Sequence, residues 1–151
     1  MNIIDFLNPE AIFIQYEAKN SEEVIGVLGA KLYQLGYVKD NFIEAALERE
    51  ADMPTGLPLG GEINAAIPHV DIEYVNRPAL GFATLKEPVI FCNMVDKDEK
   101  VPVRLVIMLA LEQPKSQIEM LQSVAGLLQQ PAVITKLMAA KSPQEILEIL
   151  A

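Results

Sequence analysis

The sequence Val-Pro-Val-Arg-Leu-Val-Ile-Met-Leu-Ala-Leu, residues 101–111, decides the fold class of this 151-residue chain. Its second part, from Leu105 to Leu111, is an unbroken apolar run. Such a run is typical of a β-strand that is buried on both faces, whereas a half-exposed strand alternates apolar and polar residues. Residues 101–111 therefore predict a central strand of a sheet that other elements cover on both sides.

Weaker strand signals lie on the N-terminal side of this segment. Residues 79–85 and 89–94 are apolar and are separated by a short polar segment that contains Pro88. Residues 63–67 are a further short apolar segment, and Ile12-Phe13-Ile14 could add one more strand. These segments place the predicted sheet in the middle of the chain.

Helix signals lie at both ends of the chain. A capping residue followed three positions later by Glu marks a helix start. The pairs are Asn20 with Glu23, Asn41 with Glu44, Ser116 with Glu119 and Ser142 with Glu145. A further helix is expected from Pro131, because proline is favoured in the first turn. Helices at both ends of a strand-rich middle predict an α/β fold: one three-layer α/β/α domain over residues 1–151, with a central mixed sheet flanked by helices.

Composition excludes several classes of partner. The formal net charge of −9 disfavours nucleic acid and anionic lipid. The N-terminal residues lack the features of a signal peptide, and the longest apolar stretch is too short to span a bilayer, so we expect a cytoplasmic protein without direct membrane insertion. The single cysteine, Cys92, cannot form an intramolecular disulfide, which fits a reducing compartment.

His69 is the only histidine in the chain. It follows Pro68 at the end of a predicted strand, and a lone histidine in such a place is more often an ordinary surface or packed residue than a functional one. One histidine and scattered carboxylates make a poor zinc site. Nucleophilic catalysis by Cys92 with His69 is conceivable, but a buried inert thiol is the simpler interpretation of Cys92.

A histidine that attacks phosphorus has modest requirements: a neutral ring nitrogen, a fixed ring and donors for the phosphoryl oxygens. Arg49, Thr55 and the backbone amides of the Gly/Pro-rich loop 52–61 could supply those donors. The simpler interpretations are a solvated helix charge for Arg49 and a turn residue for Thr55.

Three short motifs follow one another between residues 49 and 69. Arg49-Glu50, Pro54-Thr55-Gly56 and Ala65-Ala66-Ile67-Pro68-His69 together resemble the mannitol/fructose-type IIA domains of the phosphoenolpyruvate-dependent sugar phosphotransferase system. The downstream segments 88–91, 103–111 and 142–146 continue the resemblance, which covers nearly the whole chain. Among the subfamilies, the chain looks most similar to the galactitol-specific IIA protein.

The resemblance implies a phosphotransferase without metal or other cofactor. HPr, phosphorylated by enzyme I, would pass its phosphoryl group to His69, and His69 would pass it to a cysteine of a IIB component that works with IIC in the membrane. Arg49 would stabilise the phosphoryl charge, and Thr55 would lie near His69. Galactitol or a related polyol is the sugar that the resemblance implies.

The sequence leaves open the role of Gln117 and the choice between a transport function and a regulatory one. Many members of the family carry a second histidine where this chain has Gln117, which can donate a hydrogen bond but cannot titrate. Nitrogen-related IIA proteins use the same phosphohistidine chemistry for regulation, so a regulatory module is the alternative function. The sugar, the oligomeric state and the role of Gln117 are not determined by the sequence.

Overall fold

The predicted central strand is strand β5, Lys100–Ala110, in a computed structural model that describes residues 2–151. Its side chains alternate between two separate cores. Leu105, Ile107 and Leu109 lie in one core, and Val106 and Met108 lie in the other. The expectation of a strand buried on both faces is therefore confirmed.

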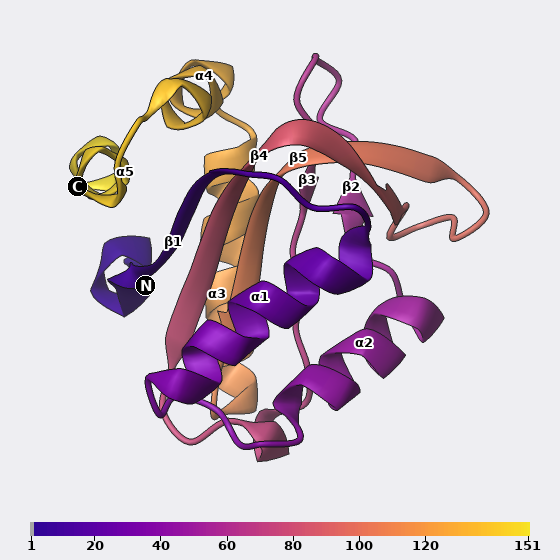
Figure 1. The fold of residues 1–151 in the computed structure, drawn as a ribbon, viewed down its shortest axis with the longest axis vertical. Helices are drawn as coiled ribbons and strands as arrows, with labels where there is room; N and C mark the ends of the chain where they lie inside the picture. Colours follow the sequence, from indigo (N-terminus) through magenta and orange to yellow (C-terminus); the bar gives the residue numbers. More distant parts are fainter. Residues whose placement is uncertain (1) are drawn as a thin grey trace.

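The sheet has five strands in the order β1-β4-β5-β3-β2 (Figure 1). Strand β1 is parallel to β4, β4 is antiparallel to β5, β3 is parallel to β5, and β2 is antiparallel to β3, so the sheet is mixed. The strands other than β5 are β1 (Leu7–Tyr16), β2 (Gly56–Leu57), β3 (Ala65–Ala66) and β4 (Ala79–Cys92).

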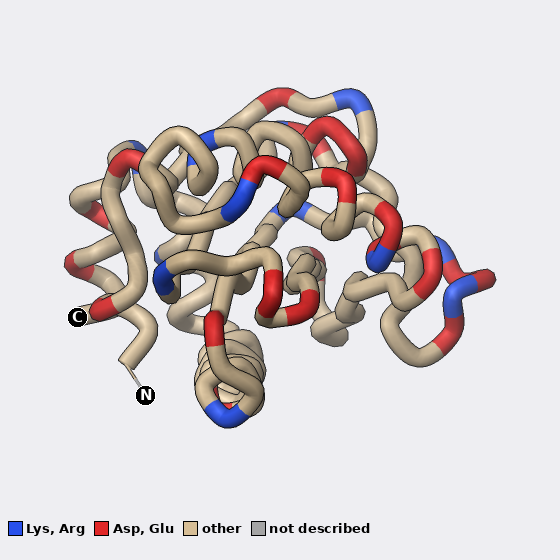
Figure 2. The backbone as a smooth tube through the Cα atoms, turned by 90° about the horizontal axis from the view of Figure 1, so that it is seen from below, with Lys and Arg blue, Asp and Glu red and all other residues tan. Residues whose placement is uncertain are grey.

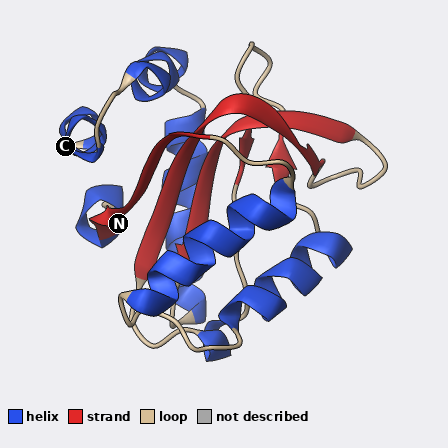
Figure 3. Cartoon of the chain, viewed as in Figure 1, coloured by secondary structure: helices blue, strands red, loops and turns tan. Residues whose placement is uncertain are grey.

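Helices cover both faces of this sheet (Figure 3). Helices α1 (Ser21–Gln34) and α2 (Phe42–Asp52) cover one face. The other face packs against helices α3 (Pro114–Leu128), α4 (Pro131–Ala139) and α5 (Pro143–Leu150). Two short 3-10 helices, η1 (Ile3–Phe6) and η2 (Ile72–Tyr74), complete the described chain. The predicted three-layer α/β/α arrangement is confirmed.

Two of the four helix starts use the predicted cap. The Asn20 side chain accepts a hydrogen bond from the backbone N–H of Glu23, and the Ser142 hydroxyl accepts one from that of Glu145. Asn41 precedes α2 without a side-chain hydrogen bond. The prediction for Ser116 was wrong, because α3 already begins at Pro114, whose missing N–H costs nothing in the first turn of a helix.

The strand prediction also needs two corrections. Residues 79–85 and 89–94 were expected as two strands, but β4 runs through Pro88 without ending, and its register against β5 shifts between Thr84 and Val89. Pro88 is exposed there. The segment 63–67 contributes only Ala65–Ala66 to the sheet, because the chain leaves regular pairing before His69.

No helix within residues 2–151 is long and apolar enough to cross a membrane. Lys and Arg positions are scattered among Asp and Glu positions (Figure 2). Lys and Arg positions thus do not gather into one patch on the side that this view shows.

Candidate functional site

His69 lies where the chain leaves the sheet after β3. Its backbone forms an isolated parallel bridge with Leu109 of β5, and the carbonyl of Pro68 accepts a hydrogen bond of 2.9 Å from the Leu109 N–H. The side chain is half-buried. The central strand thus holds the main chain at His69 while the ring stays accessible from one side.

Two contacts fix the tautomer of the imidazole ring. Nδ1 lies 2.8 Å from the backbone oxygen of Ile67, and Nε2 lies 3.3 Å from Nη2 of Arg49. A carbonyl oxygen can only accept a hydrogen bond and a guanidinium can only donate one. Nδ1 must therefore carry the proton, and Nε2 must present its lone pair to Arg49.

The surroundings keep this ring neutral. Burial lowers the pKa of His69 and the positive charge of Arg49 also lowers it, while the hydrogen bond to the Ile67 carbonyl and the charge of Asp71 act in the opposite direction. Burial is the largest of these effects, because a low-dielectric environment disfavours the charged form. At neutral pH, Nε2 is thus an unprotonated nitrogen that can act as a nucleophile.

Arg49 reaches His69 from the last turn of α2. Its Nη1 lies 3.4 Å from the Asp71 carboxylate, which is 70% exposed, so this ion pair contributes little to stability. Its Nε is buried and has no hydrogen-bond partner within residues 2–151. The atom that faces Nε2 of His69 is Nη2, which belongs to a fork of donors that suits phosphoryl oxygens.

Thr55 is buried and is hydrogen-bonded to Glu50, a residue to which the sequence alone assigned no role. Its backbone N–H donates to Glu50 Oε2 at 2.7 Å, and its hydroxyl donates to Glu50 Oε1 at 2.8 Å. The described residues show no hydrogen bond between Thr55 and His69. The signal available in the sequence was the position of Glu50, next to Arg49 and five residues before Thr55.

An open depression of about 670 Å³ brings the three predicted residues together. His69, Arg49 and Thr55 share its wall with apolar side chains, and Val95 at its rim is 89% exposed. The apolar lining residues are Met53, Pro54, Leu57, Ile67, Met94, Val95, Leu121 and Ala125. Asp52 and Lys97 also line the depression, so the three predicted residues share it with two further charged side chains and a mostly apolar lining.

Gln117 supports the segment after His69. From the first turn of α3, its Nε2 donates a hydrogen bond of 2.9 Å to the backbone oxygen of Val70. The residue at the position of the second histidine thus contacts the main chain beside His69. The part of the chain that the structure describes contains no group of three or more His, Cys, Asp or Glu side chains placed to hold a metal ion.

The fold and the contacts of His69 define a class: an α/β domain that presents one neutral imidazole beside a guanidinium in an open depression. The chain belongs to the EIIA 2 family of the phosphoenolpyruvate-dependent sugar phosphotransferase system, whose model matches residues 5–151. The resemblance inferred from the motifs is thereby confirmed.

Three relatives illustrate this membership. The galactitol-specific EIIA component of Escherichia coli K12 is 34% identical over 123 residues, which cover 81% of this chain and 80% of that protein. The mannitol-specific EIICBA component of the same strain is 33% identical over 150 residues, covering 96% of this chain. This chain spans only 22% of that longer relative. In the solved complex of IIA mannitol with phosphorylated IIB mannitol from Escherichia coli, one chain superposes with a TM-score of 0.77 at 30% identity, covering 95% of each chain.

Proposed function

We propose that the protein is a cytoplasmic phosphocarrier that accepts a phosphoryl group from phospho-HPr on Nε2 of His69 and passes it to a cysteine of a IIB component. In the first step the N–P bond of the donor breaks and an N–P bond forms at Nε2. Nε2 has no proton to lose, because the ring proton is on Nδ1, so no general base is needed. In the second step the IIB cysteine attacks as a thiolate, so that a P–S bond forms, the N–P bond breaks and Nε2 regains its lone pair.

One observation carries this proposal: the ring is held between the Ile67 carbonyl at Nδ1 and the Arg49 guanidinium at Nε2. Positioning and electrostatic stabilisation do most of the work in phosphoryl transfer. The carbonyl orients the nucleophile, and the guanidinium supplies positive charge where the phosphoryl group would arrive. Thr55 is the third residue that we assign to this site.

The open depression suits two partners that dock in turn. Most of its lining residues are apolar, Met53 and Met94 among them, and the buried part of a protein interface is apolar and enriched in methionine. We therefore assign HPr and IIB to the same face, with IIC in the membrane as the component that moves the sugar. The names of the relatives support a polyol such as galactitol as that sugar. We also propose that residues 1–151 act as one domain, although Met1 lies outside the described residues.

The test is incubation with phosphoenolpyruvate, enzyme I and HPr, followed by intact-mass measurement. We expect the gain of one phosphoryl group that is labile in acid and stable in base, because protonated imidazole is a good leaving group. His69→Gln should abolish the gain and leave the circular dichroism spectrum unchanged. A phosphoryl group that persists in His69→Gln would refute the assignment.

A further inference from the structure

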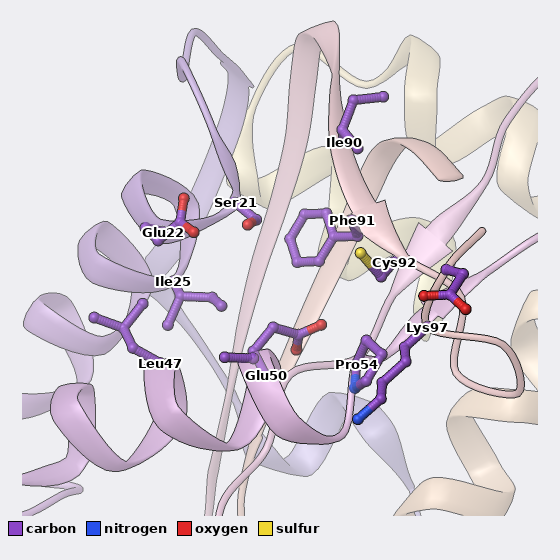
Figure 4. A pocket seen from close by; sticks show the side chains of 12 residues that line it. Ser21, Glu22, Ile25, Leu47, Glu50, Pro54, Ile90, Phe91, Cys92 and Lys97 are labelled. Carbon is purple, nitrogen blue, oxygen red and sulfur yellow. The ribbon is translucent and has the colours of Figure 1, made fainter. Parts of the chain in front are cut away.

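Glu50 lies behind the wall of the His69 depression, between that site and a second cavity. Both of its carboxylate oxygens accept hydrogen bonds from Thr55. On its other side Glu50 lines a separate cavity of about 320 Å³, which it shares with Pro54, Phe91 and Cys92 (Figure 4). Within residues 2–151, the hydrogen bonds of the carboxylate thus link it to the candidate site through Thr55, while the second cavity gives it a route to water.

This arrangement determines the direction of the Thr55 hydroxyl hydrogen. An ionised carboxylate can only accept, so the single hydroxyl hydrogen of Thr55 must point at Glu50. Only lone pairs of Oγ1 then remain for other neighbours, and lone pairs repel phosphoryl oxygens. A protonated Glu50 would donate to Oγ1 instead and would release the Thr55 hydrogen toward the depression.

The charges around Glu50 make its protonation state sensitive to a new anion. Burial raises the pKa of Glu50, whereas the two hydrogen bonds from Thr55 and the charge of Arg49 lower it. The other ionisable groups that line the second cavity are Glu22 of α1, Cys92 of β4, and Lys97 and Asp98 of the β4–β5 turn. Lys97 and Asp98 carry opposite charges, so among the described residues the positive charge that opposes protonation of Glu50 is that of Arg49. A phosphoryl group, with nearly two negative charges, would raise the pKa of Glu50 further.

We propose that Glu50 is a positioning residue that binds a proton when His69 is phosphorylated, and that this turns the Thr55 hydroxyl from Glu50 to the phosphoryl oxygens. The inference rests on the proposed function. The proton comes from water in the second cavity and returns to water when the phosphoryl group leaves, so the N–P exchange itself stays balanced. Glu50 acts through Thr55 and has no contact with the phosphoryl group.

The direct test is a titration of the wild-type protein that follows the Glu50 side-chain carboxyl carbon by NMR. Spectra are recorded for the unphosphorylated protein and for protein that excess phosphoenolpyruvate, enzyme I and HPr keep phosphorylated at each pH, with intact mass checked at each point. We expect the pKa of Glu50 to be higher in the phosphorylated protein, because a nearby negative charge disfavours the ionised carboxylate. An unchanged Glu50 pKa would overturn the proposal.

A second test uses the equilibrium of phosphoryl exchange with HPr. Proton uptake by Glu50 makes phosphorylation more favourable as the pH falls between the two Glu50 pKa values. The equilibrium constant of the wild type divided by that of Glu50→Gln should therefore rise by up to about tenfold for each pH unit of decrease in that window. Glu48→Gln is the matched control, because it removes one exposed charge from the same helix, and its ratio to the wild type should stay flat.

Three outcomes separate the possible failures. The effect of Glu50→Gln on the transfer rate is measured in the wild type and again in protein that carries Thr55→Val. If the effect is equally large in both, Glu50 does not act through Thr55 and the proposal is overturned. Protein that gains no phosphoryl group at all would overturn the proposed function and this inference together. Phosphorylation on His69 with a constant Glu50 pKa would overturn this inference alone.

Discussion

Replacing Arg49 by Ala should slow phosphoryl transfer far more than it weakens the fold. Nη2 of Arg49 lies 3.3 Å from Nε2 of His69, in place to donate to a group that arrives there. Losing one well-placed donor to a transition state costs about 10²–10³ in rate, or about 2.7–4 kcal/mol. The ion pair that is lost as well involves the 70% exposed Asp71, and such pairs contribute about 0–1 kcal/mol to stability.

The assay is single-turnover transfer from phospho-HPr, with the carrier concentration varied to separate binding from the chemical step. Arg49→Ala should lower the limiting rate and leave the half-saturating concentration nearly unchanged. Arg49→Lys should recover only part of the rate, because it keeps the charge and loses the fork. Arg77→Ala is the control, since that guanidinium hydrogen-bonds the backbone oxygen of Leu35. An unchanged limiting rate with weaker docking would refute a role for Arg49 in transfer and make it an interface residue.

The remaining predictions concern the ring, its support and the close packing of the site loop. Because burial lowers the pKa of His69, the midpoint of its titration in nitrogen NMR should lie below the ordinary 6.5. The same spectra should show the proton of the neutral ring on Nδ1. A midpoint above 6.5 would contradict the burial argument. Gln117→Leu should lower the free energy of unfolding in urea by about 1 kcal/mol, because the backbone oxygen of Val70 loses its donor, and an unchanged midpoint would show that this hydrogen bond contributes nothing. Gly56→Ala should destabilise by about 1–3 kcal/mol, since its Cβ would lie 2.5 Å from a main-chain carbonyl oxygen of β4. Gly126→Ala in α3 is the control, because its Cβ would meet nothing within 4 Å, and it should be neutral or stabilise by up to about 1 kcal/mol. Equal effects of the two changes would count against the close contact at Gly56.

Local signals predicted the elements whose stability is local. The apolar run from Leu105 to Leu111 predicted the central strand, because a strand between two helical layers must be apolar on both sides. The Asn20 and Ser142 caps predicted two helix starts, because a cap and its partner lie three residues apart. Where partners are distant, the sequence was less informative. Strand β4 continues past Pro88 because β5 pairs with it on both sides of the irregularity.

The same division holds for the candidate site. Residue type alone left His69, Arg49 and Thr55 with ordinary interpretations, and the ordered motifs that resemble the IIA family were what made them candidates for phosphoryl transfer. The tertiary structure decided which ring nitrogen carries the proton, where the guanidinium lies and what holds Thr55. Arg49 and His69 are 20 residues apart in the chain and meet only because β3 pairs with β5 and α2 packs on the same sheet. Ile67 and Glu50 are near in sequence to the groups that they bind, but a sequence does not show which nearby atoms the folded backbone brings within hydrogen-bond distance. The tautomer of His69 and the bond from Thr55 to Glu50 could therefore be assigned only from the structure.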